Sequence, residues 1–299
     1  MKGKLAAWGC LAALGLLLAR SAEAAQAVRD GLALCAGSVI PALFPFLAVS
    51  GLLTALDAGE SPALGPLARL LGCSQAGARA FLLGLTGSYP VGARTVAQLY
   101  RRGGISRREA GRLLLFSNNC GPAFILGVAG LGCFGSLRAG VLLWGVHILA
   151  ALVIALALPR RAAEPPERPG SVPARPPLVP ALIAAVRDAA GTMVYICGFV
   201  VFFLVLLRVL GRVTGLSHPV LSGAVELTQG ILALPHTRRG FVWAAGLLGW
   251  GGLSVHCQTA SVLDGTNVPL DRYFLGKALQ SLLSALLAAA LWHVIPPAA

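Results

Sequence analysis

The side chains that could bind a polar molecule gather in four glycine- and proline-containing breaks within otherwise apolar segments. In chain order, the candidate binding residues are Thr86, Gly87, Ser88, Tyr89, Pro90, Gly92 and Arg94, then Asn118, Asn119, Gly121 and Pro122, then Glu226, Thr228 and Gln229, and finally Gly252, Ser254, His256 and Gln258. Hydroxyls, amides and charges bind a polar solute by replacing the water around it. Two breaks lie in each half of the chain.

The adjacent amides of Asn118 and Asn119 are the strongest candidates for solute binding. Together they offer four donors and two carbonyl acceptors, and Gly121 and Pro122 interrupt the helix just after them. Such a site could hold a hydroxyl- or amide-bearing solute, or a cation. The alternative is structural, because amides inside a membrane commonly join neighbouring helices for about 0.6–2 kcal/mol.

The first break, Thr86–Gly92, predicts a turn between two half-helices. A half-helix that starts after Pro90 presents free N–H groups to an anion, and Arg94 lies one turn further on. The alternative is a re-entrant tip that packs against the opposite half of the protein. The two roles are compatible.

Glu226 and His256 are the titratable candidates in the second half. Glu226 is the only acidic residue between Leu221 and Leu234. A carboxylate inside a membrane indicates a functional site by default, here one linked to protons or sodium. The alternative places Glu226 in water on an interfacial helix. A lone membrane histidine such as His256 is more often a packing residue than a ligand.

The composition identifies a polytopic protein of the lipid bilayer. Of 299 residues, 57% are hydrophobic and only 12% are charged, whereas soluble domains carry about 25% charged residues. The net charge of +13 comes mainly from arginines between apolar segments, which favours membrane orientation over nucleic-acid binding. The loop 101–112 holds five arginines and marks the cytoplasmic side. Within this loop, Ser106 and Glu109 predict a capping box.

The sequence contains no pattern typical of an enzyme, a metal site or a cofactor site. The seven cysteines form no Cys-x-x-Cys pair, and neither His-Glu-x-x-His nor a phosphate-binding loop is present. Ser88 and His256 could imitate an intramembrane protease dyad, but Tyr89 and Pro90 follow the serine and no oxyanion hole is recognisable. We therefore predict no catalytic residue, cofactor or metal.

The breaks belong to a predicted all-α membrane protein of about eight helical segments, some of them re-entrant or discontinuous. Residues 1–26 predict a signal-anchor helix, although an Ala-x-Ala-like site also fits a cleaved signal. Residues 27–158 and 181–299 are two related membrane repeats, joined by a proline- and arginine-rich cytoplasmic linker, 159–180. Each repeat has a long helix, a re-entrant hairpin, an interrupted helix and a closing helix.

The second repeat is predicted to be inverted relative to the first. Ala27-Val-Arg-Asp30 opens the long helix of the first repeat, and Ala185-Val-Arg-Asp188 opens that of the second. An odd number of crossings between the cytoplasmic markers turns the second repeat upside down. The arginines at positions 208, 212, 238 and 239 count against this prediction, because they would then lie outside.

Several stretches resemble the sporulation integral membrane proteins of the YlbJ type, in order over about residues 25–295. They are Pro41-Ala-Leu-Phe-Pro-Phe46, Gly87-Ser-Tyr-Pro-Val-Gly-Ala-Arg94, Leu115-Phe-Ser-Asn-Asn-Cys-Gly-Pro-Ala-Phe-Ile-Leu-Gly127 and Gly251-Gly-Leu-Ser-Val-His-Cys-Gln258. That family carries the nucleoside-recognition (Gate) module, also seen in concentrative nucleoside transporters and the ferrous-iron transport membrane protein. The resemblance implies an endospore-forming bacterium, a membrane location and a role in spore formation.

The sequence thus predicts a transporter or channel-like binder of a small polar solute or ion. Transport would be passive, ion-coupled or driven by a partner, because no ATP-hydrolysing motif is present. The alternative is a non-transporting scaffold for spore envelope or cortex assembly, with segment 159–180 as a docking arm. The partners expected besides lipid are a second copy of the chain or other sporulation membrane proteins.

Overall fold

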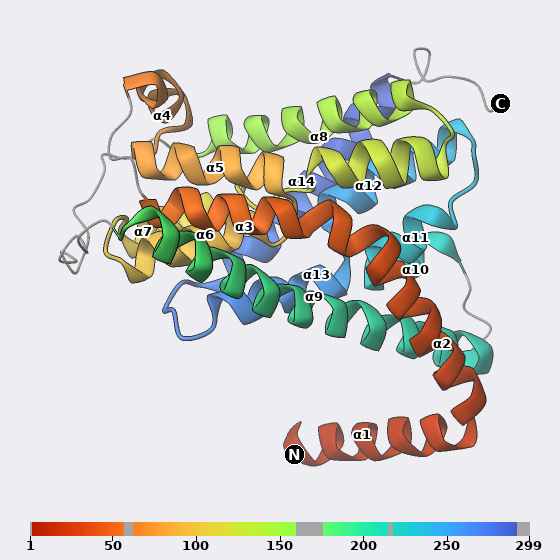
Figure 1. The fold of residues 1–299 in the computed structure, drawn as a ribbon. Helices are drawn as coiled ribbons and strands as arrows, with labels where there is room; N and C mark the ends of the chain where they lie inside the picture. Colours follow the sequence, from red (N-terminus) through yellow and green to blue (C-terminus); the bar gives the residue numbers. More distant parts are fainter. Residues whose placement is uncertain (1, 57–61, 160–175, 215–217, 292–299) are drawn as a thin grey trace.

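The computed structural model describes residues 2–56, 62–159, 176–214 and 218–291, and every regular element in these ranges is helical (Figure 1). The predicted all-α class is therefore confirmed. Four helical stretches among the described residues are long and apolar enough to cross a membrane: Ser21–Leu56, Leu137–Ala157, Leu178–Gly211 and Leu270–Ala290.

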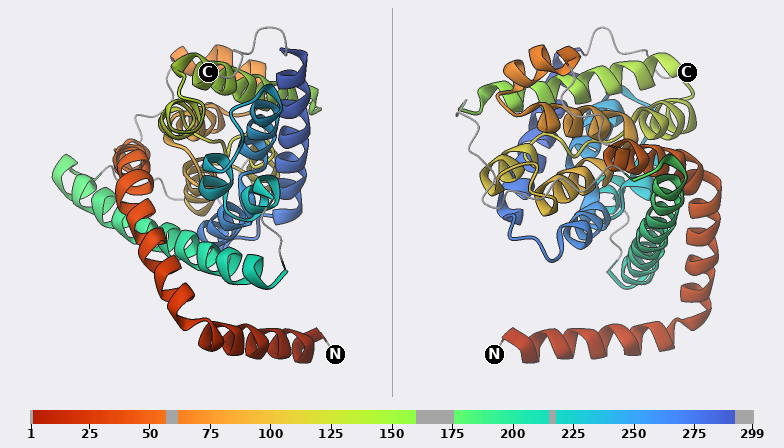
Figure 2. Two further views of the ribbon diagram at one scale, coloured as in Figure 1. Left: turned by 90° about the vertical axis from the view of Figure 1, so that its right-hand side faces the viewer. Right: turned by 60° about the vertical axis from the view of Figure 1, so that its left-hand side comes forward.

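The described helices follow one another in two series. The first half contains α1 (Lys2–Ala19), α2 (Ser21–Leu34), the π-helical turn η1 (Cys35–Val39), α3 (Ile40–Leu56), the 3-10 turn η2 (Pro62–Leu64), α4 (Gly65–Leu71), α5 (Gln75–Gly87), α6 (Val91–Arg101), α7 (Arg107–Leu113), the π-helix η3 (Ala123–Cys133) and α8 (Leu137–Ala157). The second half contains α9 (Leu178–Thr214), α10 (Pro219–Val225), α11 (Leu227–Leu232), α12 (Arg238–Trp250), α13 (Gly252–Leu263) and α14 (Leu270–Ala290). Helix α1 lies apart from the bundle formed by the others (Figures 1 and 2).

The prediction of about eight helical segments was too low, because the breaks divide the predicted segments into shorter helices. The long helix of the second half also begins earlier than predicted, at Leu178. Pro180 is accommodated there because the first turn of a helix needs no N–H donor from it. Residues 160–175 of the predicted linker lie outside the described residues.

The arginines of the loop between α6 and α7 bond to several helices at one end of the bundle. This end is named here the arginine end. Its guanidinium groups donate hydrogen bonds to main-chain carbonyls at or just after four helix C-termini: Arg101 to Val262 and Asp264 at α13, Arg102 to Thr54 in α3, and Arg112 to Leu71 in α4 and Ala155 in α8. The last carbonyls of a helix lack intrahelical donors and carry partial negative charge. The predicted cytoplasmic marker therefore also joins four helix ends.

The predicted capping box in this loop is half correct. Ser106 Oγ accepts a hydrogen bond from the Glu109 N–H at 3.2 Å, as an N-cap should. The Glu109 carboxylate does not return to Ser106, because it accepts a hydrogen bond from the Ser74 N–H at 2.7 Å. Glu109 thus connects α7 to the start of α5.

The other end of the bundle, named the opposite end, is formed by the turns after η3 and α11. The Phe134 ring centroid lies 6.4 Å from that of His236 and 5.9 Å from that of Phe241. Helix α8 begins near Phe134 and finishes at the arginine end. Helix α14 runs the other way, because Asn267, just before it, accepts a hydrogen bond from Arg107 at 2.6 Å (Figure 1).

The long helices α3 and α9 pack along each other and run in opposite directions (Figure 1). Toward the arginine end, Asp188 of α9 contacts Arg94 at 3.7 Å, and toward the opposite end Arg208 of α9 pairs with Asp30 of α2. The two charged positions of α9 are about 20 residues apart, or roughly 30 Å, which matches the hydrocarbon thickness of a bilayer. The spacing of the two ion pairs along α9 is therefore that expected between the two faces of a bilayer.

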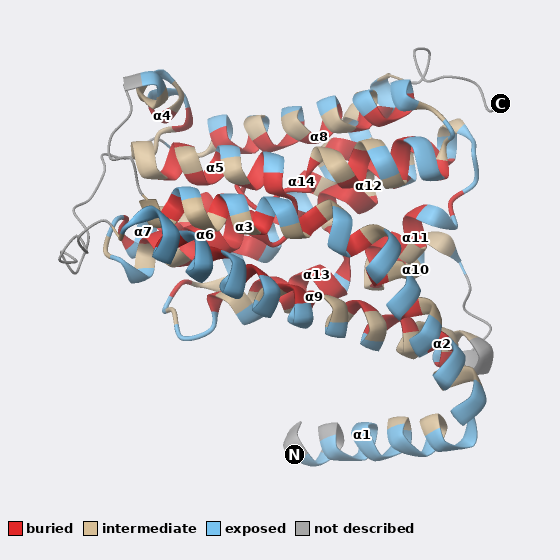
Figure 3. Cartoon of the chain, viewed as in Figure 1, coloured by how far each residue is buried: buried red, intermediate tan, exposed pale blue. Residues whose placement is uncertain are grey.

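The surface between the two faces is apolar, as a lipid-facing surface should be. Large exposed side chains on the long helices include Val194, Phe202, Leu282 and Leu286. Buried residues follow the inner faces of the helices and the short segments at the bundle centre (Figure 3). The polar residues singled out from the sequence lie mostly in that centre.

Candidate functional site

Three main-chain segments cross at the bundle centre with no side chain between them. An extended segment, Ser117–Gly121, separates α7 from η3. A Cβ atom added to Gly92 of α6 would lie 1.9 Å from the Ser117 carbonyl oxygen, and one added to Gly276 of α14 would lie 2.2 Å from that of Leu115. Only glycine permits such approaches. The glycines therefore hold hairpin α5–α6 and helix α14 against the asparagine segment.

The crossing brings Lys277 of α14 to the tip of the α5–α6 hairpin. Its Nζ donates hydrogen bonds to the Asn118 carbonyl at 2.7 Å and to Tyr89 Oη at 2.9 Å. Tyr89 Oη donates onward to the Leu248 carbonyl at 2.8 Å. Lys277 is fully buried, and no carboxylate of the described residues forms an ion pair with it. A protonated amine has three N–H groups, so one donor remains, and the charge lies 4.7 Å from the Tyr89 ring centroid without an anionic partner among the described residues.

The side chains of Asn118 and Asn119 bond to α6 and α14 at the crossing and connect it to one further helix, α13. Asn118 Nδ2 donates to Thr259 Oγ1 at 3.0 Å, and Asn118 Oδ1 accepts from the Ala93 N–H at 3.2 Å. Asn119 Oδ1 accepts from Gln280 Nε2 at 2.8 Å. These contacts correspond to the structural alternative considered for the amides, and they also fix the orientation of both amides beside Lys277.

Two histidines lie around this cluster. His147 Nε2 of α8 accepts a hydrogen bond from the Cys120 N–H at 3.1 Å and lies 3.2 Å from Gln280 Nε2. His256 Nδ1 of α13 lies 2.9 Å from Tyr273 Oη. Thr259 Oγ1 joins the two groups by donating to Tyr273 Oη at 3.2 Å. The polar centre is defined by nine residues whose side chains make these contacts: Tyr89, Asn118, Asn119, His147, His256, Thr259, Tyr273, Lys277 and Gln280.

Several polar atoms in and beside the polar centre have no hydrogen-bond partner within the described part of the chain. They are Ser117 Oγ, His147 Nδ1, His256 Nε2, Gln280 Oε1 and Ser284 Oγ, all on buried residues. Each unpaired buried polar atom costs about 1–3 kcal/mol, so folded proteins keep few of them. A polar molecule held at the centre could satisfy such atoms together with the remaining donor of Lys277.

The breaks of the second half lie next to this centre. Gly251 and Gly252 separate α12 from α13 with φ angles of +91° and +82°, a conformation that favours glycine. A Cβ atom on Gly251 would lie 3.4 Å from the Tyr89 ring. Glu226 is only 2% exposed, and its carboxylate caps α11 by accepting from the Gln229 N–H at 2.7 Å. The water-exposed alternative for Glu226 is therefore wrong.

The other predicted binding residues divide between the centre and its surroundings. Ser88, with a φ of +67°, lies beside the asparagine segment, because its Oγ faces Cys120 Sγ at 3.9 Å. Thr86 is exposed and bonds within its own helix, to the Leu82 carbonyl at 3.0 Å. Gln258 bonds Ser254 at 3.2 Å and, like Arg94, lines a cavity that opens toward the arginine end. Thr228 and Gln229 belong to the second hairpin, α10–α11.

Sequence reasoning missed Lys277, Gln280, His147 and Tyr273. The sequence does contain a signal for Lys277, which is the only Asp, Glu, Lys or Arg after Arg272. An ionisable group within a membrane helix indicates a functional site by default. Gln280 follows three residues later on the same helix face. Helix α14 is unbroken, so neither residue lies in one of the glycine- and proline-containing breaks.

Comparison with known proteins supports the expected relationship. The sporulation integral membrane protein YlbJ of Bacillus subtilis (strain 168) is 27% identical over 317 residues, which covers 89% of this chain and 77% of that protein. The chain is a distant homologue of YlbJ. No family model matches the chain, and no solved structure matches it. With its apolar helices, this relationship makes the chain a multi-pass integral membrane protein. The Gate module stays a prediction.

Proposed function

We propose that this protein binds a small polar solute with an anionic group at the polar centre and moves it across a membrane during endospore formation. The observation that carries the proposal is Lys277, which is fully buried without a carboxylate partner among the described residues. Buried charges in proteins are normally paired. A carboxylate or phosphate of the solute would supply the missing partner. The role in spore formation rests on the homology to the sporulation integral membrane protein YlbJ.

The groups around Lys277 favour an oxygen-rich solute. Gln280 Oε1 can only accept, and the hydroxyls of Ser117 and Ser284 can donate or accept. His147 Nδ1 donates, because Nε2 of the same ring accepts from the Cys120 N–H. A solute with hydroxyl or carboxyl groups would engage both kinds of atom. Binding rather than catalysis also agrees with the contacts of Ser88 and His256, because each bonds a different partner.

The directions of the helices are those expected of the predicted inverted repeat, which favours movement of the solute over binding alone. The corresponding elements run in opposite directions, α3 against α9 and α8 against α14, and the hairpins α5–α6 and α10–α11 enter from opposite ends (Figure 1). Asp30 and Asp188, which end the two Ala-Val-Arg-Asp sequences, lie toward opposite ends. In such folds, transport arises when one repeat rocks against the other around a fixed central site. Arg208, which counted against inversion, is paired with Asp30.

The experiment that tests this function is thermal unfolding of the detergent-purified protein with a panel of nucleosides, amino acids, dicarboxylates, sugar phosphates and cations. A ligand at 100 times its Kd adds about 2.7 kcal/mol to the free energy of unfolding. We expect an anionic member of the panel to raise the melting temperature, and the combined Asn118→Ala and Asn119→Ala variant to lose the effect. Silence across the panel from folded protein would refute the proposal and favour the scaffold.

A further inference from the structure

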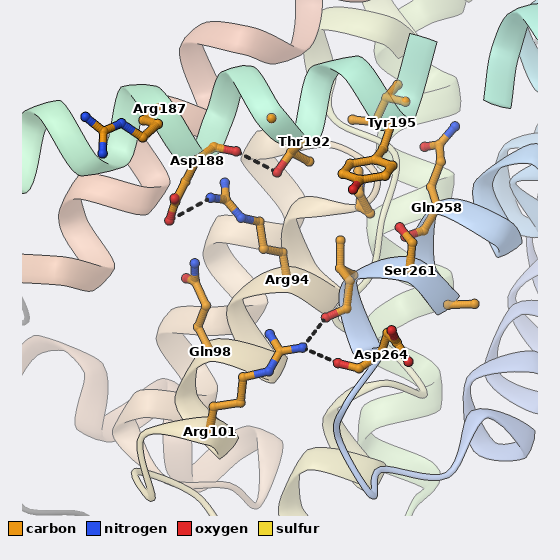
Figure 4. A pocket seen from close by; sticks show the side chains of 15 residues that line it. Arg94, Gln98, Arg101, Arg187, Asp188, Thr192, Tyr195, Gln258, Ser261 and Asp264 are labelled. Carbon is orange, nitrogen blue, oxygen red and sulfur yellow. Dashed lines mark hydrogen bonds and ion pairs between the residues drawn. The ribbon is translucent and has the colours of Figure 1, made fainter. Parts of the chain in front are cut away.

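A polar cavity of about 630 Å³ lies between α6, α9 and α13 on the side of the arginine end (Figure 4). Its walls carry three guanidinium groups and two carboxylates, from Arg94, Arg101, Arg187, Asp188 and Asp264. Arg101 donates to main-chain carbonyls at 3.0 and 2.6 Å, so its positive charge is not neutralised by a carboxylate there. The cavity wall therefore presents an excess of positive charge.

The deepest lining residues adjoin the polar centre. Pro90 directly follows Tyr89, whose hydroxyl binds Lys277, and Gln258 directly precedes Thr259, whose hydroxyl binds Asn118. At two places, therefore, a residue that lines the cavity is the direct chain neighbour of a residue that belongs to the polar centre.

The Arg94–Asp188 ion pair spans the cavity between its two walls. Arg94 belongs to α6 of the first half and Asp188 to α9 of the second, and their charged atoms are 3.7 Å apart (Figure 4). The Asp188 side chain is 62% exposed, whereas that of Arg94 is 10% exposed. Because the carboxylate is the water-exposed member of the pair, an incoming anion can take its place at the Arg94 guanidinium, which then keeps an anionic partner throughout the exchange.

We propose that this cavity is the entrance through which a solute reaches the polar centre from the arginine end, with Arg94 and Asp188 as its gate. An anion entering the cavity exchanges with Asp188 at the Arg94 guanidinium, separates α6 from α9 locally, and passes between Pro90 and Gln258. The inference rests on the proposed function for the identity of the solute. The test of the entrance does not depend on the proposed function, because a small charged reagent can probe access to the cavity without any solute.

The test uses single cysteines in a variant whose seven native cysteines are replaced. Gly191→Cys lines the cavity, and Gly198→Cys lies two turns further along α9, outside the cavity. Both positions have open space for a side chain, so both variants should fold. Membrane-impermeant methanethiosulfonates, one bearing a sulfonate and one a trimethylammonium group, are applied to each side of sealed vesicles. Ser171→Cys, in the segment between α8 and α9, serves as the reference for sidedness.

We expect Gly191→Cys to react with reagent from one side only, the same side from which Ser171→Cys reacts. After correction for intrinsic reactivity, the sulfonate reagent should react about tenfold faster than the trimethylammonium reagent. Gly198→Cys should stay unreactive. Adding Arg94→Gln should remove the preference for the sulfonate, and adding Asp188→Asn should increase it. A cysteine at the floor, Gln258→Cys, should react faster when Asp188→Asn is present.

The entrance is refuted if Gln258→Cys is inert in all backgrounds, or if it reacts from the other side. It is equally refuted if Gly191→Cys shows no dependence on Arg94 and Asp188. These outcomes are distinct from failure of the proposed function, which would appear as silence in the unfolding panel while the cysteines still react as expected.

Discussion

Replacement of Lys277 by methionine separates a ligand-binding role of this side chain from a structural one. Methionine keeps the length and the apolar stem but removes the amine. In the ligand-free protein, Lys277→Met leaves the Asn118 carbonyl without this donor, which costs about 1–3 kcal/mol. It also removes a buried charge without a carboxylate partner, a relief of several kcal/mol. We therefore expect the ligand-free stability to be unchanged or raised.

The ligand-bound protein should respond in the opposite direction. A hydrogen bond to a charged group contributes about 1.5–3 kcal/mol, so its loss weakens binding roughly 13- to 160-fold. At a concentration of 100 times the original Kd, the stabilisation by ligand should then fall from about 2.7 to between about 0.3 and 1.3 kcal/mol. Thermal unfolding with and without the active member of the panel measures both quantities in one series.

The matched control is Ser281→Ala on the same helix. Ser281 Oγ donates to the Gly246 carbonyl of α12 at 2.9 Å and is not among the residues of the polar centre. This variant should lose about 0.5–1.5 kcal/mol of stability and keep the full response to ligand. The reasoning is refuted if Lys277→Met loses more than about 2 kcal/mol without ligand yet retains the response to ligand.

Three further changes test the fold and the alternative function. Gly92→Ala places a methyl group against the Ser117 carbonyl and should abolish folding, which size-exclusion chromatography would detect as aggregation. The control Gly145→Ala has open space for the methyl group and should fold normally. Equal behaviour of the two variants would contradict the crossing. Ser106→Ala removes the N-cap of α7 and should lower the free energy of unfolding by about 1 kcal/mol, and no change in thermal unfolding would contradict the cap. Deletion within residues 160–175 should leave the response to ligand and sporulation intact, whereas a scaffold that docks through this segment would lose sporulation.

The broken helices could be predicted because glycine and proline act on the backbone directly. The turn at Ser88–Pro90 and the break at Gly251–Gly252 occur where the sequence places them, since no regular helix accommodates these residues there. The membrane spans were predictable for a similar reason, because hydropathy over about 20 residues needs no knowledge of tertiary contacts. Helix ends were less accurate, as the start of α9 before Pro180 illustrates.

The composition of the polar centre depended on contacts that sequence order hides. Lys277 meets Tyr89 across 188 positions of the chain, and Gln280 meets His147 across 133. No local sequence pattern marks these residues, because α8 and α14 are uninterrupted helices. Their polar residues can be recognised as part of a site only when the residues packed against them are known. The burial of Glu226 was likewise undecidable locally, since its carboxylate caps a helix that only the folded hairpin forms.

The glycine contacts at the crossing also bear on how such a protein can acquire a new specificity. Gly92 and Gly276 set the distances between main chains, independently of the side chains that project from Asn118, Asn119 and Gln280. Substitutions at those three positions can therefore alter what is recognised, as long as the new side chains satisfy the buried partners that these residues hold. A library randomised there, with the glycines retained, is a rational starting point for directed evolution toward other cargo.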